Sequence, residues 1–131
     1  MSTVGALVGR AAAILTNGVV YGADLDLQNA INQEGTVDFT FTLGSLTNCI
    51  LRFYAGPSAA PTDPLYLDGV IQEYTLTAST EGCFAFRCPG SRYFRASVEG
   101  TGTVTDSSVA FVYRYNDSLA DVATDGQRRI D

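Results

Sequence analysis

Hydrophobic and polar residues alternate most clearly along residues 36–43, whose sequence is TVDFTFTL. The four apolar residues of this segment fall on one side of an extended chain, and the threonine and aspartate side chains fall on the other. Period-two alternation of β-branched and aromatic residues is typical of a half-buried strand. Gly35 precedes the segment and Gly44 follows it, and both are turn signals. The pattern therefore predicts a strand with one face in a core.

The same alternation recurs along the chain up to Tyr115. Five further segments predict strands: 47–55, 72–78, 83–88, 91–99 and 108–115. Six short strands separated by turn signals are typical of a β-sandwich. A chain of 131 residues has the length of a single domain. We therefore predict an all-β fold, an antiparallel β-sandwich of jelly-roll type, in one domain with a core of residues 10–116.

The sequence also predicts the form of two connections between strands. Segments 91–99 and 108–115 flank the Gly-, Thr- and Ser-rich sequence GTGTVTDSS, so we predict that they pair as a hairpin. Segment 108–115 has apolar residues on both faces, which favours a central strand. Residues 56–68 hold three of the four prolines and predict a loop, because proline removes a ladder donor.

The two ends of the chain are less regular. We expect extended terminal arms at residues 1–9 and 117–131, short strands within 10–27, and a short helix around 26–32. Residues 4–15 (VGALVGRAAAIL) are rich in apolar side chains. A terminal segment of this kind must either join its own sandwich or pack on a neighbour, because soluble monomers rarely leave such a patch exposed.

The charge balance and the missing residue types exclude several functions. Eight arginines stand against fourteen acidic residues, giving a net charge of −6, and lysine, histidine and tryptophan are absent. An acidic chain argues against broad nucleic-acid binding, which needs a cationic face. No run approaches the roughly 18 apolar residues of a membrane span. The N-terminus lacks the basic region of a signal peptide, so we expect folding in a reducing cytoplasm.

The three cysteines are expected to be mainly free thiols. Cys83 and Cys88 lie on one predicted strand at a separation of roughly 16 Å, too far apart for a disulfide. Pairing of Cys49 with either of them is left open. Buried free thiols behave as small apolar residues.

No catalytic, cofactor or metal site is predicted. Without histidine, a Ser–His–Asp or Cys–His site cannot be built, and the glycine-rich segment lacks the lysine of a P-loop. Asp24 and Asp26 share a face, but calcium needs about six to eight oxygen ligands. The carboxylates are interpreted as solvated strand and loop residues, including the candidates for glycoside hydrolysis, which are Asp24, Asp26, Asp63, Asp68 and Glu73.

Residues 35–115 resemble small β-sandwich virion proteins of tailed bacteriophages. The resemblance lies in TVDFTFTLGSLTNCILRFYAG, in YTLTA and in CFAFRCPGSRYFRASVEGTGTVTDSSVAFVYRY. It implies a non-enzymatic capsid decoration (cement) protein that binds the major capsid protein on the virion surface and is assembled in the bacterial host cytoplasm. The alternatives are a tail or fibre-associated protein and a glycan-binding β-sandwich, for which Tyr54, Tyr66 and Tyr93 are candidate sugar contacts.

The resemblance also implies a homo-oligomer, with a trimer expected because capsid lattices offer threefold sites. The ends of the chain and the proline-containing loop are expected to carry the contacts. Arg128 and Arg129 have the chemistry for bidentate pairs with carboxylates of a partner. The candidate partner-binding residues are Leu7, Arg10, Leu15, Tyr66, Arg128 and Arg129.

Overall fold

The computed structural model describes residues 3–15, 18–28, 30–101 and 106–117. Besides strands, this part of the chain contains one 3-10 helix, η1 (Ile31–Gln33), and no helix in it is long and apolar enough to cross a bilayer. The strands are β1 (Thr3–Ala13), β2 (Gly18–Tyr21), β3 (Leu25–Asp26), β4 (Glu34–Thr42), β5 (Asn48–Gly56), β6 (Tyr66–Leu67), β7 (Val70–Ile71), β8 (Glu73–Leu76), β9 (Thr80–Arg87), β10 (Tyr93–Thr101) and β11 (Ser108–Asp117).

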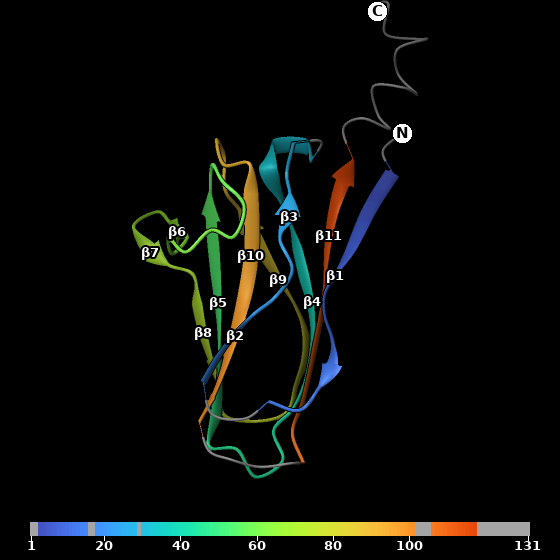
Figure 1. Ribbon diagram of the computed structural model, residues 1–131, viewed down its shortest axis with the longest axis vertical. Coiled ribbons are helices and arrows are strands. Elements are labelled where there is room, and N and C mark those ends of the chain that lie inside the picture. Colours follow the sequence, from blue (N-terminus) through green and yellow to red (C-terminus); the bar gives the residue numbers. More distant parts are fainter. Residues whose placement is uncertain (1–2, 16–17, 29, 102–105, 118–131) are drawn as a thin grey trace, which may run out of the picture.

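Eight of these strands form two antiparallel sheets that face each other (Figure 1). Sheet A has the order β1-β11-β4-β9, and sheet B has the order β3-β10-β5-β8. Successive strands change sheet at each step except from β5 to β8, which is the double-sheet arrangement of a jelly roll. The predicted antiparallel sandwich is confirmed. All six predicted strands are present, with ends displaced by no more than three residues.

The predicted hairpin between the last two strands is wrong. β10 pairs with β3 and β5 in sheet B, whereas β11 pairs with β1 and β4 in sheet A. Alternation shows that both segments are strands, but it does not show which strand lies beside which. The predicted central position of β11 is confirmed.

The core lies between the sheets and is largely aromatic. Phe86 of β9 and Phe94 of β10 stack with ring centroids 3.8 Å apart, and Phe53 meets Phe94 edge-on at 5.3 Å. Fully burying a side chain of this size contributes about 1.5–3 kcal/mol. The largest fully buried side chains are Tyr113, Phe39, Phe41, Phe53, Phe94, Phe111, Leu15, Leu27, Leu51, Val37, Val98 and Val109.

One side of the sandwich is closed by the segment that joins β2 to β3. The Gly22 N–H donates to the Ala96 carbonyl of sheet B at 2.8 Å, and the Ala23 N–H donates to the Gly9 carbonyl of sheet A at 2.9 Å. The Tyr113 hydroxyl donates to the Ala23 carbonyl at 2.8 Å and accepts from the Ala96 N–H at 3.1 Å. These contacts tie both sheets together where β1 and β10 lie nearest.

The expected N-terminal arm is an edge strand over residues 3–9. β1 pairs with β11 from Thr3 onward, with Thr3 opposite Asp117. A Cβ atom on Gly5 or Gly9 would collide with an aromatic ring of β11, so glycine lets the strand pack against those rings. Strand pairing therefore replaces the extended arm. Of the expected C-terminal arm, Asp117 ends β11, and residues 118–131 lie outside the described residues.

The short connections partly follow the expectations. β2 and β3 lie within residues 10–27, where short strands were expected, and η1 overlaps the expected helix. The predicted loop at 56–68 is wrong at its end, because β6 and β7 form a small hairpin there. Asp68 and Gly69 between these strands have φ angles of 53° and 80°. Two central residues with positive φ fit a type I′ turn, which matches the twist of paired strands.

Candidate functional site

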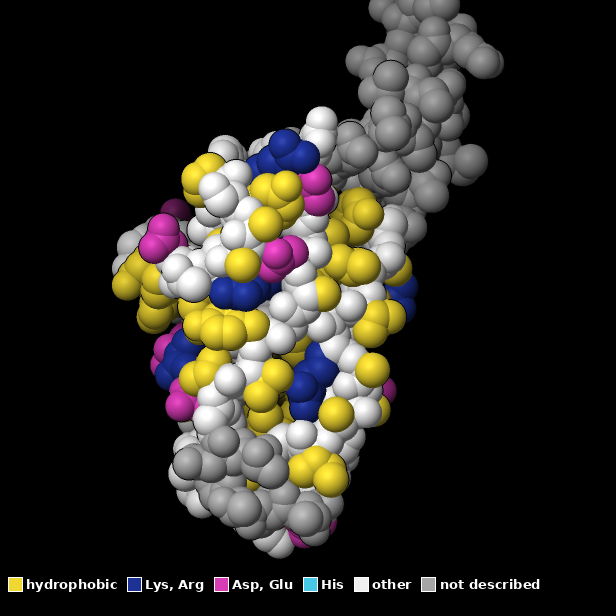
Figure 2. Space-filling model, viewed as in Figure 1, with side chains coloured by type: hydrophobic (Ala, Val, Ile, Leu, Met, Phe, Trp, Pro, Cys, Tyr) yellow, Lys and Arg dark blue, Asp and Glu magenta, His cyan; other side chains and the backbone are white. Residues whose placement is uncertain are grey.

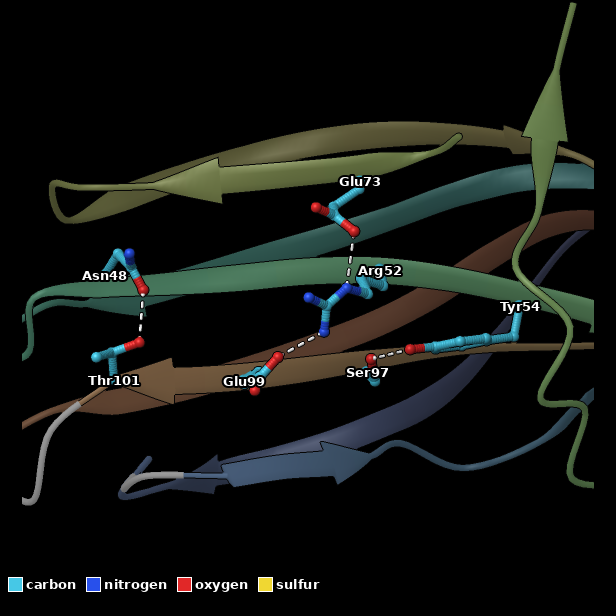
Figure 3. Close-up of polar contacts among 7 residues, drawn as sticks. All are labelled: Asn48, Arg52, Tyr54, Glu73, Ser97, Glu99 and Thr101. Atoms are coloured by element: carbon cyan, nitrogen blue, oxygen red, sulfur yellow. Dashed lines mark hydrogen bonds and ion pairs between the residues drawn. The ribbon is translucent and has the colours of Figure 1, made fainter. Parts of the chain in front are cut away.

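The outer face of sheet B carries an ion-pair network centred on Arg52 (Figure 3). The Arg52 Nε lies 2.8 Å from Glu73 Oε2, and its Nη1 lies 2.6 Å from Glu99 Oε1. The three side chains come from β5, β8 and β10, so they bridge three adjacent strands. The hydrogen bonds that Arg52 donates to Glu73, and then to Glu99, raise the pKa of Arg52. The network is a fixed cross-strand clamp with a net charge of one negative unit.

Polar contacts on either side of the clamp leave few free groups on this face. The Thr101 hydroxyl donates to the Asn48 side chain at 3.1 Å, and the Ser97 hydroxyl donates to the Tyr54 hydroxyl at 3.0 Å (Figure 3). Ser97 and Tyr54 are both buried. The Tyr21 ring packs over Tyr54 with centroids 5.5 Å apart. This part of the face is therefore occupied by the protein's own side chains.

The three tyrosines considered for sugar binding have different environments. Tyr54 is buried beneath Tyr21, Tyr93 is half-buried with Arg92 over its ring at 5.2 Å, and Tyr66 is exposed on β6. Of these rings, Tyr66 alone presents most of its surface to solvent. The expected set of sugar contacts is thus reduced to one accessible residue.

The β6–β7 hairpin (residues 66–71) is the most concentrated exposed apolar feature. Its four strand residues are all apolar or aromatic and all exposed, at 37 to 63%. They are Tyr66, Leu67, Val70 and Ile71. Figure 1 places this hairpin outside β8, and Figure 2 shows hydrophobic side chains gathered at the same place. Exposed apolar groups concentrated on one rigid turn are typical of an interaction site.

A second exposed apolar region lies on β1, β2 and the residue following β1. We call it the β1–β2 surface; its large members are Leu7, Val8, Ile14, Val19, Val20 and Tyr21. Tyr21 is held in place by Arg95, whose guanidinium lies 3.8 Å from the ring centroid and whose Nε donates to the Pro61 carbonyl at 2.8 Å. Figure 1 shows β1 at the edge of sheet A, far from the β6–β7 hairpin, whereas β2 crosses in front of β10 in sheet B.

A groove of about 580 Å³ lies at the end of the sandwich where β4 begins and β9 and β11 end. Arg87 and Arg114 carry positive charge there; Arg87 lies 3.9 Å from Glu34, and Arg114 is ion-paired with Asp38. The lining residues are Glu34, Gly35, Thr36, Leu67, Ala85, Phe86, Arg87, Arg114, Tyr115 and Asn116. Leu67 connects this groove to the β6–β7 hairpin.

The structure distributes the candidate partner-binding residues over different environments. Leu7 on β1 and Tyr66 on β6 are exposed. Arg10 is half-buried, and its guanidinium donates to the carbonyls of Val109 and Ile14. Leu15 is fully buried, so it belongs to the core rather than to a contact surface.

The remaining two candidates, Arg128 and Arg129, lie outside the described residues. The expected trimer is not tested by the described residues and stays a prediction. Sequence reasoning also missed Leu67, Val70 and Ile71 as surface residues. The signal was present, because Asp-Gly between apolar residues in LDGV is a strong short-range hairpin pattern.

Three of the five carboxylates considered for chemistry have structural partners, namely Asp24, Asp26 and Glu73, which pairs with Arg52. Asp24 accepts a hydrogen bond from the Ala60 N–H at 2.8 Å. Asp26 pairs with Arg92 and accepts from the Gln28 N–H, and these contacts, Arg92 first, hold the pKa of Asp26 below its ordinary value. Among the described residues, no group of three or more Cys, Asp or Glu side chains is placed to hold a metal ion.

Comparison with known proteins gives a likeness of fold. No protein-family model matches the chain, and no curated protein matches it. A solved structure, the SPBc2 prophage-derived protein YomS, is similar with a TM-score of 0.52 at 17% sequence identity. The similarity covers 87% of this chain and 95% of YomS. The chain is therefore similar in fold to a prophage-derived protein across nearly the whole of both.

Proposed function

We propose that this chain is a structural protein of a bacteriophage virion that decorates the capsid by binding the major capsid protein. Two observations support a phage origin: the fold likeness to a prophage-derived protein over most of both chains, and the resemblance of residues 35–115 to small virion β-sandwiches. Jelly rolls are common among viral capsid proteins. The proposed location is the outer surface of the capsid, reached after synthesis in the host cytoplasm.

The observation that carries the proposal is the exposed apolar β6–β7 hairpin. Two paired strands and a turn with positive φ at Asp68 and Gly69 hold its side chains in one geometry, so little conformational entropy is lost on binding. Each hairpin buries only a modest apolar area. A capsid presents the same partner site many times, and multivalent display strengthens weak individual contacts.

The proposal assigns no catalysis and no cofactor to the chain. Histidine is absent from the sequence. The charged cluster on sheet B formed by Arg52, Glu73 and Glu99 is held by its own ion pairs. These features support a role in binding and stabilising the head rather than in chemistry.

The first test locates the protein in purified particles of the phage that carries its gene. Cryo-electron microscopy of those particles, compared with particles from a deletion of the gene, is expected to show extra density on the head. Density on the tail or fibres instead would move the assignment to the tail-associated alternative. Absence of the protein from purified particles would refute a virion role.

A second test asks whether the hairpin makes the contact. The double variant Tyr66→Thr and Val70→Thr keeps β-branched or polar side chains suited to a strand. We expect it to lose binding to heads lacking the protein by about tenfold or more, since apolar anchors dominate such contacts. The matched control is Val19→Thr with Val20→Thr on β2. If the control loses binding and the hairpin variant does not, the β1–β2 surface carries the contact and our assignment of the hairpin is wrong.

A further inference from the structure

Strand β9 is the one edge of the two main sheets, within the described residues, that is both long and unprotected (Figure 1). The edge strands β3 and β8 have two and four residues. β1 has two register shifts, and its Gly9 carbonyl already accepts from the Ala23 N–H. β9 has eight residues, pairs with β4 on one side, and contains neither proline nor lysine. Open edges of this kind are templates for another strand unless they are blunted.

The side chains of β9 divide cleanly between its two faces. The exposed outer face carries Glu81, Cys83, Ala85 and Arg87. The inner face carries Phe84, which is half-buried against Tyr74 with ring centroids 4.7 Å apart. In the antiparallel pair with β4, alternate residues of β9 direct their N–H and C=O groups toward β4, and the others direct them to the open edge. The backbone of β9 is therefore ready to accept a second strand.

We propose that β9 is a self-association edge, at which a second copy of this chain pairs antiparallel with β9 about a twofold axis through Phe84. In such a pair the same surface is used by both copies. Glu81 then lies opposite Arg87 of the partner subunit, and Arg87 lies opposite Glu81 of the partner subunit. The two sheets A become one continuous sheet across the dimer.

Charge selects this register over its neighbours. An axis perpendicular to the sheet keeps outer faces with outer faces, so the pairing must be centred on a residue rather than between two residues. Centring on Cys83 places Glu81 opposite Ala85 of the partner subunit and forms no ion pair. Centring on Phe84 forms two opposite-charge cross-strand pairs, a stabilising arrangement in sheets.

The groups needed for these pairs are available in a single copy. Glu81 makes no ion pair with any residue that the structure describes. Arg87 is 60% exposed and makes only a 3.9 Å contact with Glu34. On the inner face, Phe84 meets Phe84 of the partner subunit and extends the aromatic core across the edge. The inference rests on the described residues of β9 and does not depend on a role in a virion. It is an alternative to the trimer that the resemblance implies, and the test below distinguishes the two.

Charge reversal tests the register directly. Sedimentation velocity over a range of concentrations is expected to show a dimer for the natural chain. Either Glu81→Arg or Arg87→Glu places like charges opposite each other twice in the symmetric interface, so we expect each to weaken dimerisation by about tenfold. Combining both substitutions restores two opposite-charge pairs and is expected to restore dimerisation. A monomer or a trimer of the natural chain, or a double variant as weak as the single ones, overturns the proposal.

A designed cross-link gives an independent reading of the same register. With the pairing centred on Phe84, Ala85→Cys stands opposite Cys83 of the partner subunit, close enough for a disulfide. Mild oxidation is expected to yield covalent dimers of Ala85→Cys. The matched control, Ala85→Cys with Cys83→Ser, is expected to stay monomeric on a denaturing gel. Equal cross-linking of both variants overturns the register, because the control can be cross-linked there only through the thiols introduced at position 85 of the two copies.

Discussion

The hydroxyl of Tyr113 in sheet A acts as a strand partner for Ala96 in sheet B. β3 pairs with only Tyr93 and Phe94 of β10, so the edge groups of β10 beyond Phe94 need other partners, and the Ala96 carbonyl accepts from the Gly22 N–H. There the Ala96 N–H donates to the Tyr113 hydroxyl at 3.1 Å, and the hydroxyl donates onward to the Ala23 carbonyl at 2.8 Å. Burial raises the pKa of Tyr113. One side chain thus satisfies two backbone groups and links the two sheets.

Replacing Tyr113 with phenylalanine is expected to destabilise the fold by about 2 kcal/mol, because it leaves backbone groups of Ala96 and Ala23 without a partner in the interior. Urea unfolding measures this loss. The control is Tyr115→Phe, since the Tyr115 hydroxyl makes no hydrogen bond with the described residues. Equal loss in the two variants would show that the hydroxyl bridge contributes no more to stability than a tyrosine hydroxyl without these partners.

Gly9→Ala is expected to destabilise the chain by about 1–3 kcal/mol through overpacking. A Cβ atom at Gly9 would lie 2.5 Å from the Phe111 ring and 2.8 Å from the Tyr113 ring. The matched control is Gly56→Ala on β5, where a new Cβ would make only an ordinary contact with Pro61 at 3.5 Å. Thermal unfolding of both variants checks the difference. A drop in Gly56→Ala as large as that in Gly9→Ala would contradict the packing argument.

The three cysteines are expected to differ in their reaction with a thiol reagent, because one is exposed and two are buried. All three are free; Cys83 is exposed, whereas Cys49 and Cys88 are buried. The folded protein is therefore expected to expose one reactive thiol, and the unfolded protein three, without prior reduction. Cys83→Ser should abolish the reaction of the folded protein. Fewer than three thiols in the unfolded natural chain would indicate a disulfide and contradict the expectation.

Stability is expected to fall at alkaline pH partly through the buried thiols. Burial raises the pKa of Cys49 and of Cys88 from about 9 to about 12. A pKa raised in the folded state means that the stabilisation is complete below pH 9 and is lost as the pH rises toward 12. Urea unfolding at about pH 8 and about pH 11 measures the loss.

The control for this pH dependence is the double variant Cys49→Ala with Cys88→Ala. It starts from a lower stability, because cavities are left in the core. Its free energy of unfolding should nevertheless decline less steeply with pH, since the two chains differ only in the buried thiols. Parallel declines would mean that the thiols do not contribute.

Which face of each strand is buried could be predicted, because the alternation of apolar and polar residues lies within the strand itself. Val37, Phe39 and Phe41 alternate with polar residues on β4, and all three are buried. Which strands become neighbours depends on contacts far apart in the sequence, and alternation carries no information on them. That is why β10 and β11 looked like a hairpin and instead lie in opposite sheets.

β1 and the β6–β7 hairpin escaped prediction for different reasons. The inward positions of β1 include Gly5 and Gly9, whose missing side chains are replaced by rings from β11, so no alternation of size is visible. At the hairpin, the prolines upstream of Tyr66 are typical of a loop, and the turn signal at Asp68 and Gly69 is flanked by only a few apolar residues on each side. The contact surface proposed here could be predicted only at Tyr66.

Sheet A pairs Thr3, the first described residue, with Asp117, the last. On the ribosome, β1 therefore has no strand partner until almost the whole described chain has been made. Until then its apolar residues, such as Leu7 and Val8, are open to chaperones and to other nascent chains. Folding rates fall as pairing becomes less local. The step that completes sheet A consequently follows the synthesis of β11, and a chain shortened before β11 leaves β1 as an exposed apolar segment rather than a strand.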